Sequence, residues 1–170
     1  MKITLIGMPT AGKTTLGKIW SNQLHLPFID LDEEIAKKEN KSISTLFTEE
    51  GETYFRAIER EILDDLLILP YTLIIATGGG TPCFHNNLTR INQAGISIFL
   101  NTPLEKIIQR LSTTKTDRPL FKNLSIDEFK KKVTHLYNQR LPYYTQAAYK
   151  ISQDSDKDTI RDLIKKKISS

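Results

Sequence analysis

The chain has 170 residues, of which 39% are hydrophobic and 26% charged, and its formal net charge is +4. This length predicts a single domain with a full central sheet, and the composition excludes a disordered or fibrous chain. No apolar run approaches the roughly 20 residues that span a bilayer, so we expect no membrane partner. We expect no signal peptide after Met1. The single cysteine, Cys83, fits a reducing, cytoplasmic setting.

The surplus of positive charge lies mainly in two lysine clusters, at residues 130–132 and 165–167. Nucleic-acid binding is typically supported by aromatic side chains beside such lysines, and no aromatic platform accompanies them. Interspersed acidic residues are typical of solvated helix faces. We therefore expect no nucleic-acid partner, whereas a basic balance suits an enzyme with anionic substrates.

The first predicted strand, Lys2–Ile6, runs directly into Gly7-Met8-Pro9-Thr10-Ala11-Gly12-Lys13-Thr14. This segment fits the pattern G-x-x-x-x-G-K-[ST] of a phosphate-binding loop, or P-loop. Apolar residues then recur at helical spacing, at Leu16, Ile19, Trp20 and Leu24. A strand, a glycine-rich turn and a helix N-terminus direct backbone N–H groups and the helix dipole at a phosphate.

This loop predicts a nucleoside triphosphate ligand, and we expect the loop together with Thr15 to bind ATP. Lys13 should reach the β- and γ-phosphates, and the Thr14 hydroxyl should bind Mg²⁺. The alternative is a chance glycine turn with a surface lysine. The strand before the loop and the helix after it disfavour that alternative.

The second predicted strand, Pro27–Asp30, ends at a pair of carboxylates, Asp30 and Asp32. At the carboxyl end of a strand next to the P-loop, one carboxylate could hold Mg²⁺ or its waters, and the other could accept a substrate hydroxyl proton. Asp32 could instead cap the helix that follows. The segment from Asp32 to about Arg60 is helical and predicts an inserted substrate-binding module.

A helix within and beyond this insertion carries an apolar stripe at Phe55, Ile58, Ile62 and Leu66. Arg56 and Glu59 lie three residues apart on it, so they are neighbours. Taken alone, this pair is best explained as an exposed ion pair of little energetic value.

The third predicted strand, Leu73–Thr77, runs into Gly78-Gly79-Gly80. Three glycines at the carboxyl end of a central strand allow a substrate to lie directly on the backbone. A flexible turn is the alternative, although one glycine would suffice for it.

The fourth predicted strand, Ile96–Leu100, precedes a helix that starts near Thr102, and a polar segment at about 112–124 follows that helix. This segment predicts a mobile lid, and Arg118 within it could stabilise a transferring phosphoryl group or remain a solvated loop residue. Arg110, just before the lid, could stack on the adenine base.

A further helix starts at Ser125, with apolar residues expected inward at Ile126, Phe129, Val133 and Leu136. Arg140 extends that inward stripe, so it requires an anion. With Arg56 it could clamp a substrate carboxylate, or it could pair with a core carboxylate. The last predicted strand is Tyr149–Ser152. This alternation predicts an α/β fold: a five-stranded, doubly wound parallel sheet with helices on both faces.

Together these segments resemble the shikimate kinase family along nearly the whole chain. The resemblance rests on the P-loop, the Asp30-x-Asp32 pair, Phe55-Arg56-x-x-Glu59, the three glycines, Arg118-Pro119-Leu120 and Arg140 followed by Pro142-Tyr143-Tyr144. It implies a nucleoside-monophosphate-kinase-like P-loop fold. It also implies transfer of the ATP γ-phosphoryl group to the 3-hydroxyl of shikimate with Mg²⁺, on the route to chorismate and the aromatic amino acids.

The resemblance also implies roles for individual residues. Lys13, Asp32 and Arg118 are the implied catalytic residues, and Asp30 lies near the metal waters. Asp32, Arg56, Gly78, Gly79, Gly80 and Arg140 are the implied shikimate-binding residues. Glu59 orients Arg56, and the two arginines bind the shikimate carboxylate.

The chain departs from the family in its P-loop, where Met8-Pro9 is atypical and Thr10 stands where glycine is usual. If that position has a positive φ, Thr10 is strained. Two alternatives stay open: a related kinase for another acceptor, such as gluconate or a nucleoside monophosphate, and a non-catalytic P-loop switch. The motifs N-K-x-D and D-x-x-G, which a switch would need, do not appear. We expect a monomer.

Overall fold

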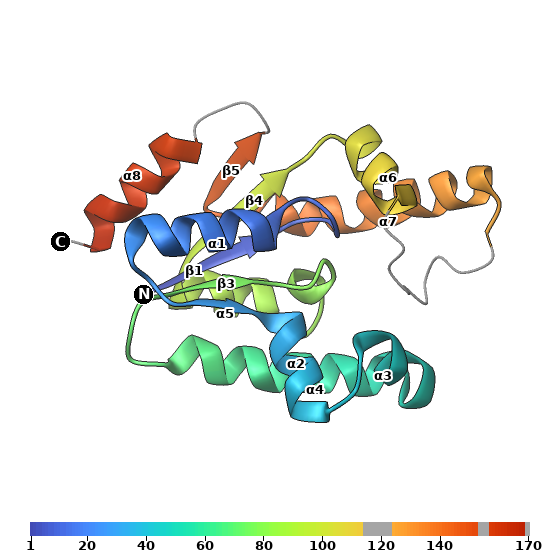
Figure 1. Cartoon of the computed structure of the whole chain (residues 1–170), viewed down its shortest axis with the longest axis horizontal. Helices are drawn as coiled ribbons and strands as arrows, with labels where there is room; N and C mark the ends of the chain where they lie inside the picture. Colours follow the sequence, from blue (N-terminus) through green and yellow to red (C-terminus); the bar gives the residue numbers. More distant parts are fainter. Residues whose placement is uncertain (114–123, 153–156, 169–170) are drawn as a thin grey trace.

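The computed structural model describes residues 1–113, 124–152 and 157–168. A five-stranded parallel sheet, ordered β2-β3-β1-β4-β5, lies between helices on its two faces (Figure 1). The strands are β1 (Lys2–Ile6), β2 (Phe28–Asp30), β3 (Leu73–Ala76), β4 (Gly95–Asn101) and β5 (Tyr149–Ser152). The predicted fold class and all five predicted strands are confirmed, with ends that differ by at most one residue.

The helices connect the strands in the order that a doubly wound sheet requires. They are α1 (Lys13–Leu24), α2 (Leu31–Glu39), α3 (Ile43–Glu49), α4 (Gly51–Ile68), α5 (Asn87–Ala94), α6 (Leu104–Thr113), α7 (Ile126–Tyr144) and α8 (Lys157–Ile168), with a short 3₁₀ turn, η1 (Thr81–Cys83). Among the described residues, none of these helices combines the length and apolarity needed to cross a membrane.

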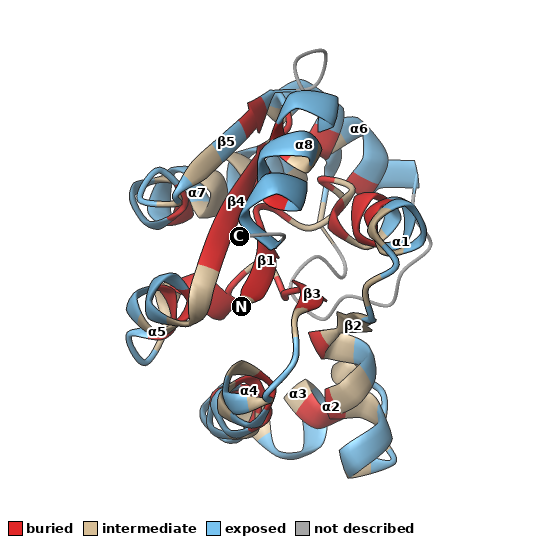
Figure 2. Cartoon of the chain, turned by 90° about the vertical axis from the view of Figure 1, so that its left-hand side faces the viewer, coloured by how far each residue is buried: buried red, intermediate tan, exposed pale blue. Residues whose placement is uncertain are grey.

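The sheet is covered on both faces, which explains why its strands are apolar throughout instead of alternating. Every residue of β1 and β3 is buried, and Figure 2 shows the central strands in the interior. Trp20 packs from α1 onto one face, and Phe99 and Tyr144 stack on the other. Lys2 is also buried, and its Nζ donates to the carbonyl oxygens of Leu69 and Tyr71, which fixes the loop before β3.

The predicted insertion corresponds to α2, α3 and the first half of α4, which lie beside the β2 edge of the sheet (Figure 2). The second half of α4 belongs to the core, because Ile62, Leu63 and Leu66 pack with Leu73 and Ile75 of β3. The insertion is therefore anchored through a helix that it shares with the core.

Two local expectations change in the structure. Residues 112 and 113, assigned to the lid, are the last residues of α6, and residues 114–123, including Arg118, lie outside the described residues. Ser125 starts α7 with a capping box to Glu128, as its sequence suggests, but Ile126 is 72% exposed and not inward. Ile126 is the first residue of α7, whereas the buried residues of this helix begin at Val133.

Candidate active site

The P-loop joins β1 to α1 and forms one wall of a cavity with a volume of about 890 Å³. The other walls come from the ends of β2 and β3, at Asp30, Asp32 and Gly78, and from residues near β4, β5 and α8. This is the carboxyl end of the parallel strands, where ligands of such sheets bind. Of the loop residues expected to bind ATP, those from Pro9 to Thr15 line this cavity, whereas Gly7 and Met8 are not among its lining residues, because Met8 is buried in the core.

Lys13 is buried at the start of α1, and its Nζ donates to the carbonyl oxygens of Gly7 (2.9 Å) and Met8 (2.8 Å). Its ammonium group is therefore held inside the loop, where a bound phosphate would also lie. Gly12, with φ 100°, caps the helix without a side-chain bond, so the first N–H groups of α1 keep an open face.

Thr10 has φ 62°, in the left-handed region that β-branched residues rarely adopt. The expected strain at this atypical position is therefore present. The Thr10 hydroxyl donates to the Pro9 carbonyl oxygen at 2.6 Å, and the Thr10 carbonyl accepts from Arg110 Nη1 at 3.0 Å. Local hydrogen bonds thus hold the loop in a conformation that glycine would adopt freely.

Replacing Thr10 by glycine is expected to stabilise the fold by about 0.5–1 kcal/mol, because glycine has no steric cost at positive φ. In a domain of this size the melting temperature should rise by about 1–4 °C in thermal unfolding. Thr48→Gly, inside α3, is the matched control and should lower it. A lower melting temperature for Thr10→Gly would show that the hydroxyl bond to Pro9 outweighs the strain.

The N-cap of α2 is Asp30, and not Asp32 as the capping alternative proposed. The helix begins at Leu31, and Asp30 is its N-cap, accepting the Asp32 backbone N–H at 3.1 Å. The other Asp30 oxygen accepts the Thr14 hydroxyl at 2.6 Å. Asp30 therefore both caps α2 and pairs with Thr14, and the Asp32 side chain projects from the first turn of α2 into the cavity.

The three glycines bring the predicted substrate-binding residues together. A Cβ atom on Gly78 would lie 2.9 Å from Asp32 Oδ1, and one on Gly79 would lie 2.9 Å from Arg140 Nη1. A Cβ on Gly80 would lie 2.5 Å from Arg56 Nη2. Each glycine is thus packed against one of the three side chains, and any larger residue would displace it.

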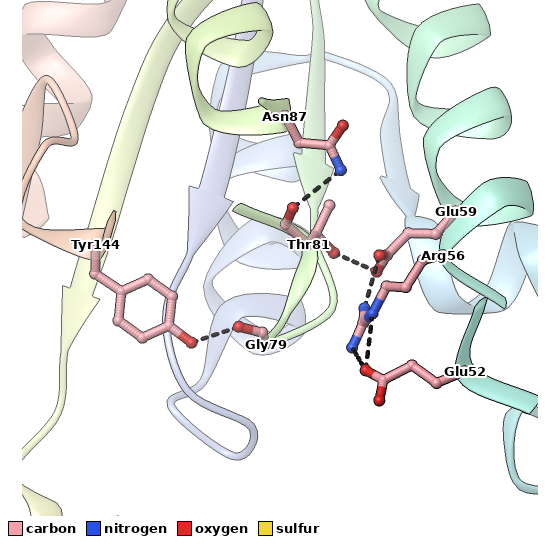
Figure 3. A network of polar contacts seen from close by, with 7 residues as sticks. All are labelled: Glu52, Arg56, Glu59, Gly79, Thr81, Asn87 and Tyr144. Carbon is pink, nitrogen blue, oxygen red and sulfur yellow. Dashed lines mark hydrogen bonds and ion pairs between the residues drawn. The ribbon is translucent and has the colours of Figure 1, made fainter. Parts of the chain in front are cut away.

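Arg56 and Glu59 form a buried ion pair, with Nη1 to Oε2 at 2.7 Å and Glu59 fully buried. The exposed-ion-pair interpretation is therefore wrong, because α4 packs this face against the glycine turn. Nε and Nη2 of Arg56 each donate to Glu52 Oε1 at 3.2 Å (Figure 3). The guanidinium carbon also lies 4.2 Å from the centroid of the Phe84 ring. These contacts use three of the five guanidinium N–H bonds and leave one on each terminal nitrogen.

Arg140 is buried on the inner face of α7, as its helical spacing predicts. The alternative, a salt bridge to a core carboxylate, is not seen: within the described residues no carboxylate forms an ion pair with it. Burial raises the pKa of the neighbouring Cys83 thiol to about 11, although Arg140 and Arg56 act in the opposite direction. The thiol is therefore neutral beside two cationic groups, and it leaves them available to an anion.

Three supporting residues had no role predicted from the sequence: Glu52, Thr81 and Tyr144, the last of which lies in the segment after Arg140 that carries the resemblance. Glu52 precedes Arg56 by four residues, a helical spacing that could have predicted their contact. Thr81 donates from Oγ1 to Glu59 Oε1 at 2.6 Å, and Tyr144 donates to the Gly79 carbonyl at 2.5 Å (Figure 3). These last two contacts join segments 22 and 65 residues apart, so spacing could not reveal them.

The end of the cavity away from the glycines is lined by Thr102, Lys106, Arg110, Ile151 and Lys157. Thr102 Oγ1 donates to the Ala11 carbonyl at 3.0 Å, which ties the end of β4 to the P-loop. Arg110, expected near the adenine base, is placed on this wall by α6.

Comparison with known proteins agrees with this geometry. A family model described as "Shikimate kinase" matches residues 9–169. A shikimate kinase from Bacteroides thetaiotaomicron is 39% identical over 158 residues, which cover 93% of this chain and 90% of that relative. A crystal structure of shikimate kinase from the same species superposes with a TM-score of 0.87 at 34% identity, and covers 100% of this chain and 99% of that one.

A second solved structure is the shikimate kinase of Acinetobacter baumannii in complex with shikimate. It superposes with a TM-score of 0.85 at 32% identity and covers 99% of this chain and 93% of that one. The family match spans the P-loop from Pro9 onwards, the glycine turn and both buried arginines. The chain belongs to the shikimate kinase family.

Proposed function

We propose that this chain transfers the γ-phosphoryl group of ATP to the 3-hydroxyl of shikimate, which yields shikimate 3-phosphate and ADP. The observation that carries this proposal is the convergence of Asp32, Arg56 and Arg140 on one glycine turn beside the P-loop. A substrate with a carboxylate at one side and hydroxyls at the other needs guanidinium groups that bind the carboxylate and an anionic side chain that accepts a hydroxyl proton. The same arrangement disfavours a nucleotide switch, and the family match favours shikimate over gluconate as the acceptor.

The P-loop amides and Lys13 bind the phosphates in this proposal, with Lys13 exchanging its bonds to Gly7 and Met8 for phosphate oxygens. Thr14 and Asp30 are the proposed site for Mg²⁺ and its waters. Their oxygens already lie 2.6 Å apart, and hydroxyl and carboxylate oxygens are the donors that Mg²⁺ prefers. The ion would neutralise charge on the β- and γ-phosphates.

Asp32 is the proposed partner of the reacting hydroxyl. The 3-hydroxyl oxygen forms a bond to the γ-phosphorus as the bond from that phosphorus to the ADP oxygen breaks, and the hydroxyl proton passes to an Asp32 carboxylate oxygen. The remaining N–H bonds of Arg56 and those of Arg140 hold the carboxylate, so the acceptor is oriented before transfer. Gly78, Gly79 and Gly80 provide the backbone surface beneath it.

Two further roles belong to the same proposal. Arg118, which lies outside the described residues, is the proposed side chain that stabilises the transferring phosphoryl group. Arg110 contacts the adenine base, supported by its position on the cavity wall beside Lys106 and Ile151. We propose a cytoplasmic monomer, and light scattering on the purified protein tests the oligomeric state.

The experiment that tests the function is ADP release from purified protein with Mg·ATP and one acceptor at a time. The acceptors are shikimate, gluconate, a mixture of nucleoside monophosphates, and none. Release that depends on shikimate alone, and that stops when EDTA removes the divalent metal, is the expected result. Release with another acceptor, or equal slow release with none, would overturn the substrate assignment and leave only nucleotide binding.

A further inference from the structure

Tyr144 is buried at the C-terminal end of α7, four residues after Arg140 and therefore on the same helix face. Its ring stacks on Phe99 of β4, with ring centroids 5.1 Å apart. Its hydroxyl donates to the Gly79 carbonyl at 2.5 Å and lies 3.7 Å from the Met8 sulfur. One hydroxyl thus lies where the P-loop, the glycine turn and the arginine-bearing helix meet.

Gly79 is held by all three of these elements. A Cβ on Gly79 would lie 2.6 Å from Pro9 Cδ and 2.9 Å from Arg140 Nη1, and its carbonyl accepts the Tyr144 hydroxyl. The atypical Met8-Pro9 pair of this P-loop therefore packs directly at this point. A peptide held on all sides cannot rotate without moving either the phosphate loop or Arg140.

The bond to the Gly79 carbonyl also sets the direction of the next amide. In a trans peptide the carbonyl and the following N–H point in opposite directions, so the Gly80 N–H points away from Tyr144. Figure 3 shows Tyr144 on one side of Gly79 and the Arg56 network on the other. Within the described residues the Gly80 N–H donates no hydrogen bond, which leaves it available on the side where Arg56 lies.

We propose that Tyr144 is a positioning residue for shikimate. Its hydroxyl fixes the Gly79–Gly80 peptide, so that the Gly80 N–H faces the substrate. The same bond keeps Arg140 in its position beside the glycine turn. Burial raises the pKa of Tyr144, so the phenol stays protonated and remains a donor throughout the physiological range. The proposal rests on the carboxylate clamp, which Arg140 variants test separately.

The test is Tyr144→Phe, which removes the hydroxyl and keeps the stacked ring. We expect the KM for shikimate to rise about 3- to 10-fold, the loss that one hydrogen bond typically causes, with the KM for ATP within about 2-fold. The matched control is Tyr143→Phe, the same change at the adjacent, 41%-exposed tyrosine, and it should leave all constants unchanged. Calorimetric titration with shikimate should reproduce the loss as weaker binding.

Thermal unfolding separates positioning from a purely structural role. If Tyr144 only stabilises the fold, Tyr144→Phe lowers the melting temperature and leaves the KM for shikimate equal to that of Tyr143→Phe. That result overturns the proposal, as does an equal rise in the KM for both substrates. If Tyr144→Phe fails to fold, Phe99→Leu, which removes the ring that stacks on Tyr144 and so loosens its hydroxyl, must show the same selective rise in the KM for shikimate, and an unchanged KM would overturn the proposal.

Discussion

Replacing Asp32 by asparagine is expected to lower kcat about 10²- to 10³-fold and to leave ATP binding within about twofold. The substitution keeps the shape of the side chain against Gly78 but removes the negative charge that would orient the reacting hydroxyl and take its proton. The backbone N–H at position 32 still donates to the Asp30 carboxylate, so Asp30 should still cap α2. Steady-state ADP release and calorimetric titration of a non-hydrolysable ATP analogue measure the two effects.

The control for this change is Glu33→Gln, the same loss of charge at the next residue of α2, where the side chain is exposed. Its kinetics should match those of the unmodified protein. A loss of ATP binding in Asp32→Asn, or a fall in kcat of less than about fivefold, would contradict the proposed role. The first outcome would place Asp32 on the phosphates, and the second would make it dispensable for transfer.

The second large effect is expected from Arg140→Ala, which should raise the KM for shikimate about 10²-fold with a smaller fall in kcat. A lost bidentate, charge-assisted contact is worth about 3 kcal/mol, and every 1.4 kcal/mol corresponds to tenfold in affinity. Arg140 is a clean site for this test because no carboxylate among the described residues would be left buried and unpaired. The same truncation at Arg56 would strand the fully buried Glu59 and confuse binding with stability.

Lys131→Ala is the matched control, because it removes one positive charge from an exposed position of the same helix. It should change the KM for shikimate by less than about twofold. Methyl shikimate, which lacks the anionic carboxylate, should lose less affinity than shikimate does when Arg140 is replaced by alanine. If Arg140→Ala kept the original KM, Arg140 would not contact the carboxylate, and the clamp would be excluded.

The sequence was most informative where a local pattern has one physical meaning. The P-loop consensus after an apolar strand needs no distant residue, because the loop, Lys13 and Thr14 are contiguous. The five strands are likewise local runs of apolar residues, and the parallel arrangement follows from the helices between them. The positive φ of Thr10 was anticipated only as a condition, because the resembling family usually has glycine at that position.

The residues of the acceptor site are different, because their meaning depends on what packs against them. Spacing put Arg56 beside Glu59, but whether that pair was an exposed contact or a buried clamp depended on where α4 meets the glycine turn. The burial of Arg140 could be anticipated from its helical stripe, whereas its separation from every described carboxylate could not. The resemblance to a family favoured the carboxylate clamp before the packing was known, and that role stays a prediction.

The fold class, the phosphate-binding loop and the identity of the charged residues could all be predicted from the sequence, because each depends on contiguous or periodic segments. Only the tertiary structure decided how those charges are used. It buried Glu59, made Asp30 the cap of α2, and brought Thr81 and Tyr144 onto the glycine turn. The physical reason is that desolvation and hydrogen-bond direction arise from contacts between distant segments, as between Tyr144 and Gly79, 65 residues apart, and no local pattern specifies such contacts.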